Sequence, residues 1–408
     1  MGGDAVAERV RAFYERHPYP PPVGDLERYR RAWQDPGRRR ADHHLFWPAR
    51  PYAQGETASV LVAGCGTSQA AKHAMRWPGA RVTGIDFSAT SVRATAALKR
   101  QHDLRNLEVH QLPLERVGEL GATFDQIVCT GVLHHLADPD AGLLALRDVL
   151  ARDGAMHLMV YAPYGRAGIY MVQELCGRVG VEATSDGIRD LARALEALPP
   201  GHPLAPLLRE APDFQDEAGL ADALLNPRDR AYSVPQVFEL LERARLTFGR
   251  WVRQAPYSPR CGALSRLALG ERMARLASRD QYAALELFRG TMVRHSLVAH
   301  RDADRAGAQR VDFSGEAWLR YVPIVAPDAI CVRERLPPGV EAVLINKAHS
   351  FADLVLPIDA RERRMFEAID GRRTLGDLAR SEGRQEASVR AFFERLYAYD
   401  QVVFDTSG

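Results

Sequence analysis

The stretch that most constrains the fold is Ser59–Thr67, SVLVAGCGT, in which an apolar run enters a glycine-rich turn. An alanine-rich amphipathic stretch follows from Ser68. This pattern is typical of a buried parallel strand that delivers the backbone to the N-terminus of a helix. Glycines in such a turn let the main chain approach a ligand closely, and the free N–H groups of the first helical turn face the same place. The pattern therefore predicts a ligand site at the turn.

A second predicted strand, residues 81–85, ends in Asp86, twenty residues after Gly66. In folds that bind nucleosides, an acidic residue at this place accepts hydrogen bonds from ribose hydroxyls. We therefore expect a ligand that contains a nucleoside. The alternative is an ordinary strand–helix–strand turn without a ligand.

Length and composition limit the class of protein. A chain of 408 residues predicts two or more compact units, and 46% apolar with 26% charged residues is typical of a globular protein. The net charge of +2 gives no electrostatic reason for a nucleic-acid or membrane partner. Five scattered cysteines make no disulfide framework, and His43–His44 lack the spacing of a metal site, so no metal is expected. With no signal region and no apolar run long enough to span a bilayer, we expect a cytoplasmic protein.

From Ser59 to Tyr161 the predicted strands and helices alternate without a break. Asp138 and Pro139 have the residue types of a helix start, with Asp as N-cap and Pro at the first helical position. This alternation predicts an α/β fold with a parallel, doubly wound sheet and a ligand at the carboxyl ends of its strands. Strands are predicted at 59–63, 81–85, 107–110, 124–129 and 154–161, and helices at 67–76, 88–103 and 139–150.

Four segments carry a family resemblance. In this order, AGCGT, GIDFS, FDQIVCTGVLHHLADP and DGAMHLMVY resemble the class I S-adenosylmethionine-dependent methyltransferases. The chain is most similar to bacterial members with an N-terminal Tyr-x-x-x-Pro-Tyr-Pro, here Tyr14 to Pro20. The resemblance covers residues 10–165 and continues more weakly to 300. It implies a Rossmann-like seven-stranded core, with the last two strands at 246–252 and 292–298, S-adenosylmethionine as cofactor and S-adenosylhomocysteine as product.

The same resemblance implies which residues contact the cofactor. Asp86 would bind the ribose hydroxyls, Phe87 would lie against the adenine, and Thr130 and Gly131 would lie beside the sulfonium. Val62 and Pro113 stand where the family often has acids, so the cofactor's amino groups are expected to meet carbonyls, Gln69 or Gln111. The methionine part and the adenine edge are expected to lie against Ala63, Gly64, Cys65, Gly66, Leu112, Pro113 and Leu114. Aromatic faces can hold the sulfonium by cation–π contact, and the candidates are Tyr14, Tyr19, Tyr161 and Tyr164.

A hydroxyl or protonated amine acceptor needs a base near neutral pH, for which histidine is suited. We predict that His135 is this base. In similar small-molecule methyltransferases, such as phosphoethanolamine methyltransferase, a histidine at the matching place pairs with an N-terminal tyrosine. Tyr19, on the stiff proline segment, is predicted to close the site with it. The alternative is that His135 only contacts the cofactor and moves no proton.

Three domains are predicted. Residues 1–57 would form an N-terminal helix, a proline-rich lid and an Arg-rich segment. Residues 58–302 would form the methyltransferase domain, with a helical insertion at 164–245 that covers the substrate. Residues 303–408 would form a small α+β, winged-helix-like domain. Its balanced charge argues against a DNA role, so packing, dimerisation or protein binding is expected of it.

The sequence therefore predicts methyl transfer from S-adenosylmethionine to a small-molecule O or N nucleophile. Three alternatives stay open: methylation of a protein, peptide or RNA presented by the C-terminal domain, a non-catalytic regulator that senses the cofactor, and an NAD(P)-linked oxidoreductase. The last is disfavoured because Gly64-x-Gly66-x-x-Gln69 lacks the third glycine of the dinucleotide motif. The expected partners are a small-molecule acceptor and a second copy or another protein at the C-terminal domain, but no membrane and no nucleic acid.

Overall fold

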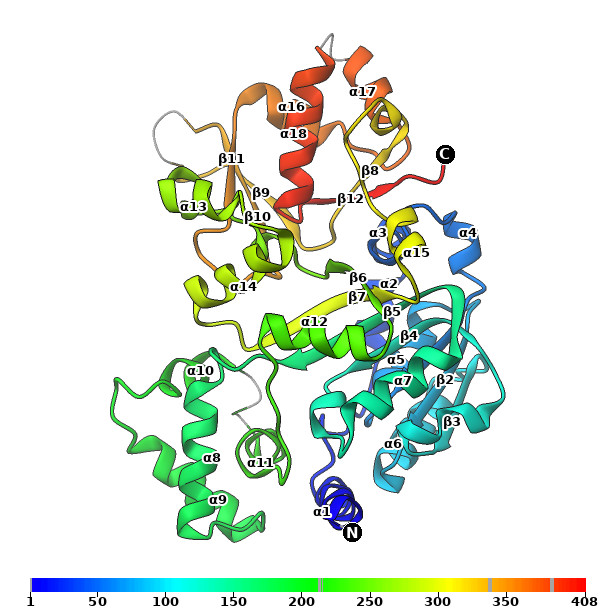
Figure 1. The fold of residues 1–408 in the computed structure, drawn as a ribbon. Coiled ribbons are helices and arrows are strands. Elements are labelled where there is room, and N and C mark those ends of the chain that lie inside the picture. The colour runs from blue at the N-terminus through cyan, green and yellow to red at the C-terminus, as the bar shows by residue number, and fades with distance from the viewer. Residues whose placement is uncertain (1, 212–213, 215, 337–339, 382–384) are drawn as a thin grey trace. The chain divides into compact units, whose positions relative to one another are not determined.

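The computed structural model describes residues 2–211, 214, 216–336, 340–381 and 385–408 (Figure 1). Its main sheet has seven strands in the order β3-β2-β1-β4-β5-β7-β6. Strands β1 to β5 run parallel, and β6 pairs with β7 antiparallel. The predicted Rossmann-like seven-stranded core is therefore confirmed. The strands are β1 Ser59–Ala63, β2 Arg81–Asp86, β3 Leu107–Gln111, β4 Phe124–Thr130, β5 Leu150–Tyr161, β6 Thr247–Trp251 and β7 Arg294–His300.

Helices follow the strands of the core as the sequence predicts. Asp138 caps α7 by accepting a hydrogen bond from Ala141 N, with Pro139 in the first turn. The strand order reverses between β1 and β4, which makes their carboxyl ends the expected ligand edge. The helices are α5 Gln69–Arg76, α6 Ala89–Gln101, η1 Leu114–Leu120, η2 Leu133–His135, α7 Pro139–Val149 and α12 Val234–Arg243.

The N-terminal residues 8–30, here called the clasp, hold to the core through specific contacts. The clasp contains the end of α1 (Gly2–Arg16) and the start of α2 (Glu27–Trp33). The Glu15 carboxylate accepts hydrogen bonds from Ala89 N and Thr90 N at the start of α6. Thr67 Oγ1 donates to the Pro20 carbonyl at 2.7 Å. These contacts fix the proline segment beside the glycine turn.

The insertion after β5 is helical, as expected. Its helices are α8 Ala167–Val179, α9 Ser185–Glu196, α10 Ala205–Glu210 and α11 Glu217–Leu225. They share a hydrophobic core with Phe13 of α1, formed among others by Ile169, Ile188, Leu204 and Leu220. The clasp and the insertion are thus packed together through apolar side chains. Within the described ranges, no helix has the length and apolarity that crossing a bilayer requires.

The chain divides into two compact units that do not follow the predicted domain boundaries at 57 and 302. Unit 1 contains residues 1–30, 58–246 and 289–296, and unit 2 contains 31–57, 247–288 and 297–408. The segment 31–57 groups with the C-terminal residues because its helix α3 (Pro36–Phe46) packs on β12 and β8. Ala41 of α3 shares a small core with Ile324 and Val403.

Unit 2 contains two further antiparallel sheets, β11-β10-β9 and β12-β8. Residues 359–405 follow the expected order of helix, short helix, helix and strand, and Asp359 and Glu362 form the predicted capping box. The remaining elements are α4 Tyr52–Gly55, η4 Ala255–Tyr257, η5 Ala263–Arg266, α13 Ala268–Met273, α14 Ser278–Arg289, α15 Ala303–Ala308, η6 Ala317–Arg320, β8 Val322–Val325, β9 Ala329–Val332, β10 Ala342–Asn346, β11 Val355–Ile358, α16 Ala360–Glu367, α17 Leu375–Ser381, α18 Glu386–Ala398 and β12 Val402–Asp405.

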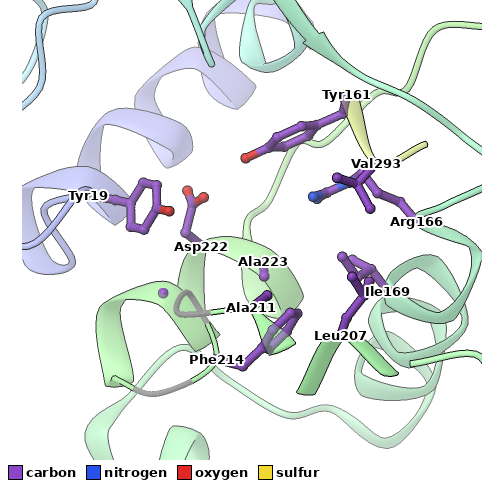
Figure 2. A pocket seen from close by; sticks show the side chains of 11 residues that line it. Tyr19, Tyr161, Arg166, Ile169, Leu207, Ala211, Phe214, Asp222, Ala223 and Val293 are labelled. Atoms are coloured by element: carbon purple, nitrogen blue, oxygen red, sulfur yellow. The ribbon is translucent and has the colours of Figure 1, made fainter. Parts of the chain in front are cut away.

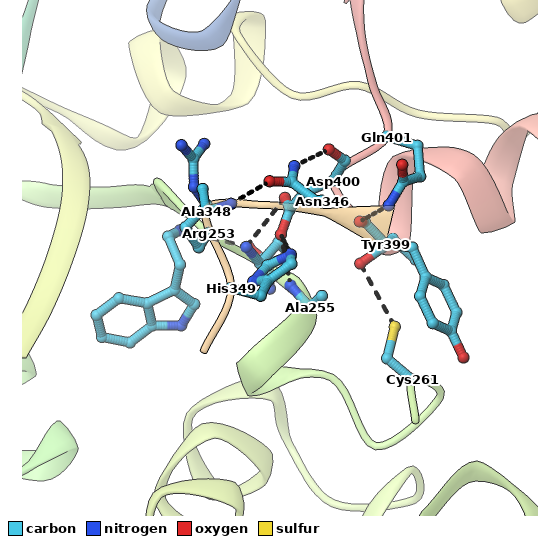
Figure 3. Close-up of polar contacts among 12 residues, drawn as sticks. Arg253, Ala255, Cys261, Asn346, Ala348, His349, Tyr399, Asp400 and Gln401 are labelled. Carbon is cyan, nitrogen blue, oxygen red and sulfur yellow. Dashed lines mark hydrogen bonds and ion pairs between the residues drawn. The ribbon is translucent and has the colours of Figure 1, made fainter. Parts of the chain in front are cut away.

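Asp400, in the turn between α18 and β12, connects several segments of unit 2 (Figure 3). Its carboxylate accepts hydrogen bonds from Gln254 N at 3.1 Å and Ala255 N at 2.9 Å. His349 Nε2 lies 3.4 Å from the same carboxylate, and Asn346 Nδ2 donates to the Asp400 carbonyl. Residues separated by more than a hundred positions are therefore tied to one buried side chain.

Candidate active site

The glycine turn brings the ends of β1 and β4 together. Gly64 has a φ of +66°, a conformation that favours glycine, and a Cβ there would come within 2.3 Å of the Val132 side chain. Ala63 ends β1, Thr130 ends β4, and Gly131 follows with a φ of +79°. Ala63 to Gly66 and Thr130 to Gly131, all predicted cofactor contacts, thus lie at one edge of the sheet. Gln69 begins α5 just behind the turn, and its N–H donates to the Cys65 carbonyl at 3.1 Å.

Asp86 lies at the same edge, at the end of β2. Its side chain is buried, and its two oxygens accept hydrogen bonds from Gly66 N at 2.8 Å and Ser88 N at 2.9 Å. Burial raises the pKa of this carboxyl, while the two N–H donors act to lower it. The carboxylate is therefore fixed between the glycine turn and α6.

The residues expected around the adenine also meet at this edge. Phe87 follows Asp86, and its ring packs edge-on against Tyr14 with centroids 6.0 Å apart. Leu112 N donates to the Asp86 carbonyl at 2.9 Å, which places Leu112, Pro113 and Leu114 beside the end of β2. Gln111 Nε2 donates to the Phe87 carbonyl.

His135 lies in η2, just after β4. Its Nδ1 is 2.6 Å from the carbonyl oxygen of Arg228. Because a carbonyl only accepts, Nδ1 carries the hydrogen and Nε2 is the nitrogen that can take a proton. Tyr14 is the N-terminal tyrosine whose ring packs against His135, with centroids 6.0 Å apart.

A cavity of about 60 Å³, here called the Asp222 chamber, lies between the clasp and the insertion (Figure 2). Figure 2 shows the Asp222 carboxylate beside the Tyr19 ring, with the Tyr161 hydroxyl directed toward the same space. One side of the chamber is polar and the other is apolar. The polar side chains are Tyr19, Tyr161, Arg166 and Asp222, and the rest of the lining is Ile169, Leu207, Ala211, Phe214, Gly219, Ala223 and Val293.

Asp222, on α11, is the site residue that the sequence analysis missed. It is 3% exposed and accepts hydrogen bonds from the Tyr14 hydroxyl at 2.7 Å and from Asn226 Nδ2 at 3.3 Å. Burial raises the pKa of this carboxyl, and nearby His135 acts in the opposite direction. Burial and Asp222 together raise the pKa of Tyr14 well above its usual value, so Tyr14 remains a hydrogen-bond donor at neutral pH. The available signal was a single acid inside the apolar run LADALL.

Arg166 and Asp229 form a buried ion pair at the chamber wall, with 2.6 Å between Nη2 and Oδ2. The guanidinium carbon lies 3.5 Å from the centroid of the Tyr161 ring, and the His134 ring stacks 3.8 Å from the same centroid. Since both groups lie so close to the centroid, they must cover opposite faces of Tyr161. Burial lowers the pKa of His134 well below its usual value, so this ring is neutral. Tyr164, the fourth aromatic candidate, is 44% exposed.

A group with metal-ligand residue types is present away from this edge, formed by Asp25, Glu27 and His102. Arg30 lies within it, with Nε 3.3 Å from Glu27 and Nη2 3.4 Å from His102 Nδ1. Leu26 N donates to His102 Nε2. Because Leu26 N donates to Nε2, the other ring nitrogen, Nδ1, carries the hydrogen and faces Glu27 Oε1 at 3.3 Å. These contacts anchor the clasp.

Several known proteins are similar to this chain in sequence or in fold. The family model Methyltransf_12, a methyltransferase domain, matches residues 61–156. The uncharacterized protein syc1184_c of Synechococcus sp. is 32% identical over 294 residues, which cover 70% of this chain and 69% of that protein. The tRNA U34 carboxymethyltransferase of Shewanella amazonensis is 42% identical over 105 residues, 24% of this chain and 30% of that protein. The solved structure of PKMT2 from Rickettsia typhi in complex with AdoHcy has a TM-score of 0.63 at 15% identity and covers 95% of this chain and 77% of that chain.

The fold, the glycine turn and the matched domain define a class I S-adenosylmethionine-dependent methyltransferase, and the predicted enzyme class and cofactor are confirmed. Within that class, the chain belongs to the same family as the Synechococcus protein.

Proposed function

We propose that this methyltransferase acts on a small-molecule O or N nucleophile whose reacting end enters the Asp222 chamber. The proposal rests above all on Tyr19, which joins the two parts of the site. A Cβ placed on Gly66 would lie 3.2 Å from the Tyr19 carbonyl oxygen, so the Tyr19 backbone lies on the glycine turn. The Tyr19 ring lines the chamber. The chamber therefore opens beside the turn expected to hold the cofactor.

The donors and acceptors at the sheet edge fit S-adenosylmethionine. The Asp86 carboxylate would accept from the ribose hydroxyls, the turn at Ala63–Gly66 would hold the methionine part, and Phe87 would lie against the adenine. Tyr14 and Thr130–Gly131 would lie beside the sulfonium. When bound, the cofactor supplies a methyl group on a positively charged sulfur.

The chain's own residues would align the acceptor, exclude water and take a proton. His135 would take the proton through Nε2, since Nδ1–H is donated to the Arg228 carbonyl. Tyr14, next to His135, and Tyr19, at the chamber wall, would close the site from the clasp. The clasp itself supports assignment to the bacterial type with an N-terminal Tyr-x-x-x-Pro-Tyr-Pro, because Tyr14 to Pro20 provides these contacts.

Two measurements test this function. Calorimetry is expected to show binding of S-adenosylmethionine and S-adenosylhomocysteine but not of NAD. Incubation with methyl-labelled cofactor and a metabolite extract is expected to transfer label into a small molecule. If the folded protein binds the cofactor but labels nothing in the extract, the proposed catalytic function is wrong. If it binds NAD alone, the assignment of S-adenosylmethionine as cofactor is wrong.

A further inference from the structure

We propose that the acceptor is an amine carried on an apolar group, and that Asp222 holds the amine nitrogen in the chamber. This inference rests on the proposed function and narrows it from O or N nucleophiles to nitrogen. It is carried by the balance of charge in the chamber.

The charged groups at the chamber are not evenly paired. Arg166 is matched by Asp229, with both side chains buried. The hydrogen-bond donors to Asp222 within the described part of the chain are the Tyr14 phenol and the Asn226 amide, both neutral. His135, which acts to lower the pKa of Asp222, can carry a positive charge, but it serves as base in its neutral form, with Nε2 unprotonated. A buried carboxylate without a permanent cation is unfavourable. A ligand that brings a positive charge to Asp222 would remove that penalty, whereas a neutral hydroxyl would not.

The surrounding side chains favour an ammonium group attached to a hydrocarbon. The Tyr19 ring stands beside Asp222 (Figure 2), and an aromatic face attracts cations. Tyr161 contributes its hydroxyl rather than a face, because Arg166 and His134 cover both faces of its ring. The opposite side of the chamber, which includes Ile169, Leu207 and Phe214, offers an apolar surface for the rest of the molecule. The small volume admits only the end that reacts.

The reaction itself moves charge toward Asp222. The ammonium first loses one proton, which His135 Nε2 can take and pass to solvent. The nitrogen lone pair then forms the new N–C bond, the C–S bond breaks, and its electron pair remains on sulfur. The positive charge thereby passes from sulfur to nitrogen. A fixed carboxylate on the acceptor side stabilises this arriving charge. For a hydroxyl acceptor the base takes the proton as the O–C bond forms and the methylated oxygen ends neutral, so the carboxylate has no positive charge to hold.

The first test identifies the methylated atom. The full chain is incubated with ¹³C-methyl S-adenosylmethionine and a cell extract split by ultrafiltration into small and large molecules. We expect the label on nitrogen, as read by NMR of the purified product. Label in the small-molecule fraction indicates a free amine, and label in the large fraction indicates an amine side chain of a macromolecule. Label on oxygen, carbon or sulfur overturns the amine inference but leaves the methyltransferase function standing. If nothing is labelled, the proposed function itself fails.

The second test removes only the charge. Asp222→Asn keeps an oxygen that can accept from Tyr14, so cofactor affinity is expected to stay within about twofold while turnover of the labelled amine falls by about 10² or more. Binding of that amine to the protein loaded with S-adenosylhomocysteine is expected to weaken in parallel. Glu217→Gln, an exposed charge on the same helix, is the matched control and should keep full turnover. Full turnover by Asp222→Asn would overturn the role of Asp222. If that variant does not fold, the identity of the methylated atom in the first test still decides whether the acceptor is an amine.

Discussion

At the scale of single residues, three buried carboxylates near the site differ in what surrounds them. Asp86 accepts from two backbone N–H groups, Asp229 faces the Arg166 guanidinium, and Asp222 has neutral donors. Burial raises the pKa of Asp86 and of Asp222. The partners of each carboxylate thus indicate its role. Asp86 is placed to bind a ribose, Asp229 binds the Arg166 guanidinium, and Asp222 is placed to bind a cationic ligand.

The first prediction concerns Asp86. Asp86→Ala removes the expected acceptor for the ribose hydroxyls and also leaves Gly66 N and Ser88 N without their partner. Losing hydrogen bonds to a charged acceptor costs about 2–4 kcal/mol, so cofactor affinity is expected to fall by about 30-fold or more. Calorimetry with S-adenosylhomocysteine measures this, with Asp190→Ala on the exposed face of α9 as control. Unchanged affinity in a folded Asp86→Ala variant would take Asp86 out of the site.

The second prediction concerns proton transfer. His135→Ala is expected to lower turnover by about 10²–10⁴-fold and to leave cofactor affinity nearly intact. Tyr14→Phe and Tyr19→Phe each keep the ring and remove the hydroxyl, so they separate the role of the hydroxyl from the role of the ring. A double variant of His135 and Tyr19 should lose less than the product of the single losses, because the residues would act as one unit. If His135→Ala keeps full turnover with the identified acceptor, the histidine is only a wall of the pocket.

Some site residues could be found from the sequence and others could not. The glycine turn and Asp86 were predictable because a strand, a turn and a second strand fix their positions locally. Asp222 was not, since its role depends on Tyr14, which is 208 positions away. The contact of Tyr14 with His135 also depends on how the clasp folds back, and the proline segment does not encode that direction.

At the scale of elements, the buried histidines of α3 make this helix sensitive to acid. His43 Nε2 donates to the Arg50 carbonyl at 2.9 Å, so its buried Nδ1 carries no hydrogen. Burial, with the charges of His44 and Arg50, lowers the pKa of His43 from its usual 6.5 to about 3, although the hydrogen bond to the Arg50 carbonyl acts to raise it. Asp405 also acts weakly to raise it. The folded helix therefore requires a neutral ring.

The third prediction follows from the sign of that shift. Between pH 6.5 and about 3 the unfolded chain binds a proton that folded His43 does not. The contribution of neutral His43 to the free energy of unfolding of unit 2 is therefore fully present above pH 6.5. Below that pH it falls by about 1.4 kcal/mol per pH unit. Chemical denaturation at several pH values measures the slope. His43→Gln should flatten it, whereas His110→Gln, an exposed histidine on β3, should not. Equal slopes in the wild type and His43→Gln would contradict the assignment.

The elements themselves were largely predictable, because their signals are local. The Asp138–Pro139 helix start and the Asp359–Glu362 capping box stand where the sequence places them. The fifth strand differs, since β5 begins at Leu150 rather than 154. Its first residues continue directly from α7, with a register shift between Phe124 and Gln126 on the neighbouring β4. The turn-forming residues Asp153 and Gly154 lie inside the strand, which is why the sequence pattern starts it too late.

At the scale of the whole molecule, unit 2 is built from three separate stretches of chain. Its contacts join residues that lie far apart in the sequence, so sequence patterns of a few residues do not predict them. His44 Nε2 lies 3.3 Å from Asp405 Oδ2, and Arg250 Nη2 lies 3.4 Å from Asp400 Oδ1. The predicted boundary at 302 follows the end of the family resemblance, whereas the packing of α3 and of residues 247–288 depends on the C-terminal hundred residues.

The last prediction tests this dependence. A chain ending at Arg301 keeps residues 31–57 and 247–288 but loses β8, β12 and Asp400, against which they pack. We therefore expect it to aggregate or to unfold at lower temperature, rather than to behave as an independent methyltransferase domain. Asp400→Ala in the full chain isolates one part of the effect. It leaves Gln254 N, Ala255 N and the partly buried Arg250 without their carboxylate, which should cost about 3–5 kcal/mol. Asp353→Ala, also in unit 2 but half-buried and accepting from Ala263 N at 3.2 Å, is the milder comparison. A monomeric 1–301 chain with unchanged melting temperature and cofactor affinity would show that the C-terminal residues are dispensable for the fold of the other two stretches.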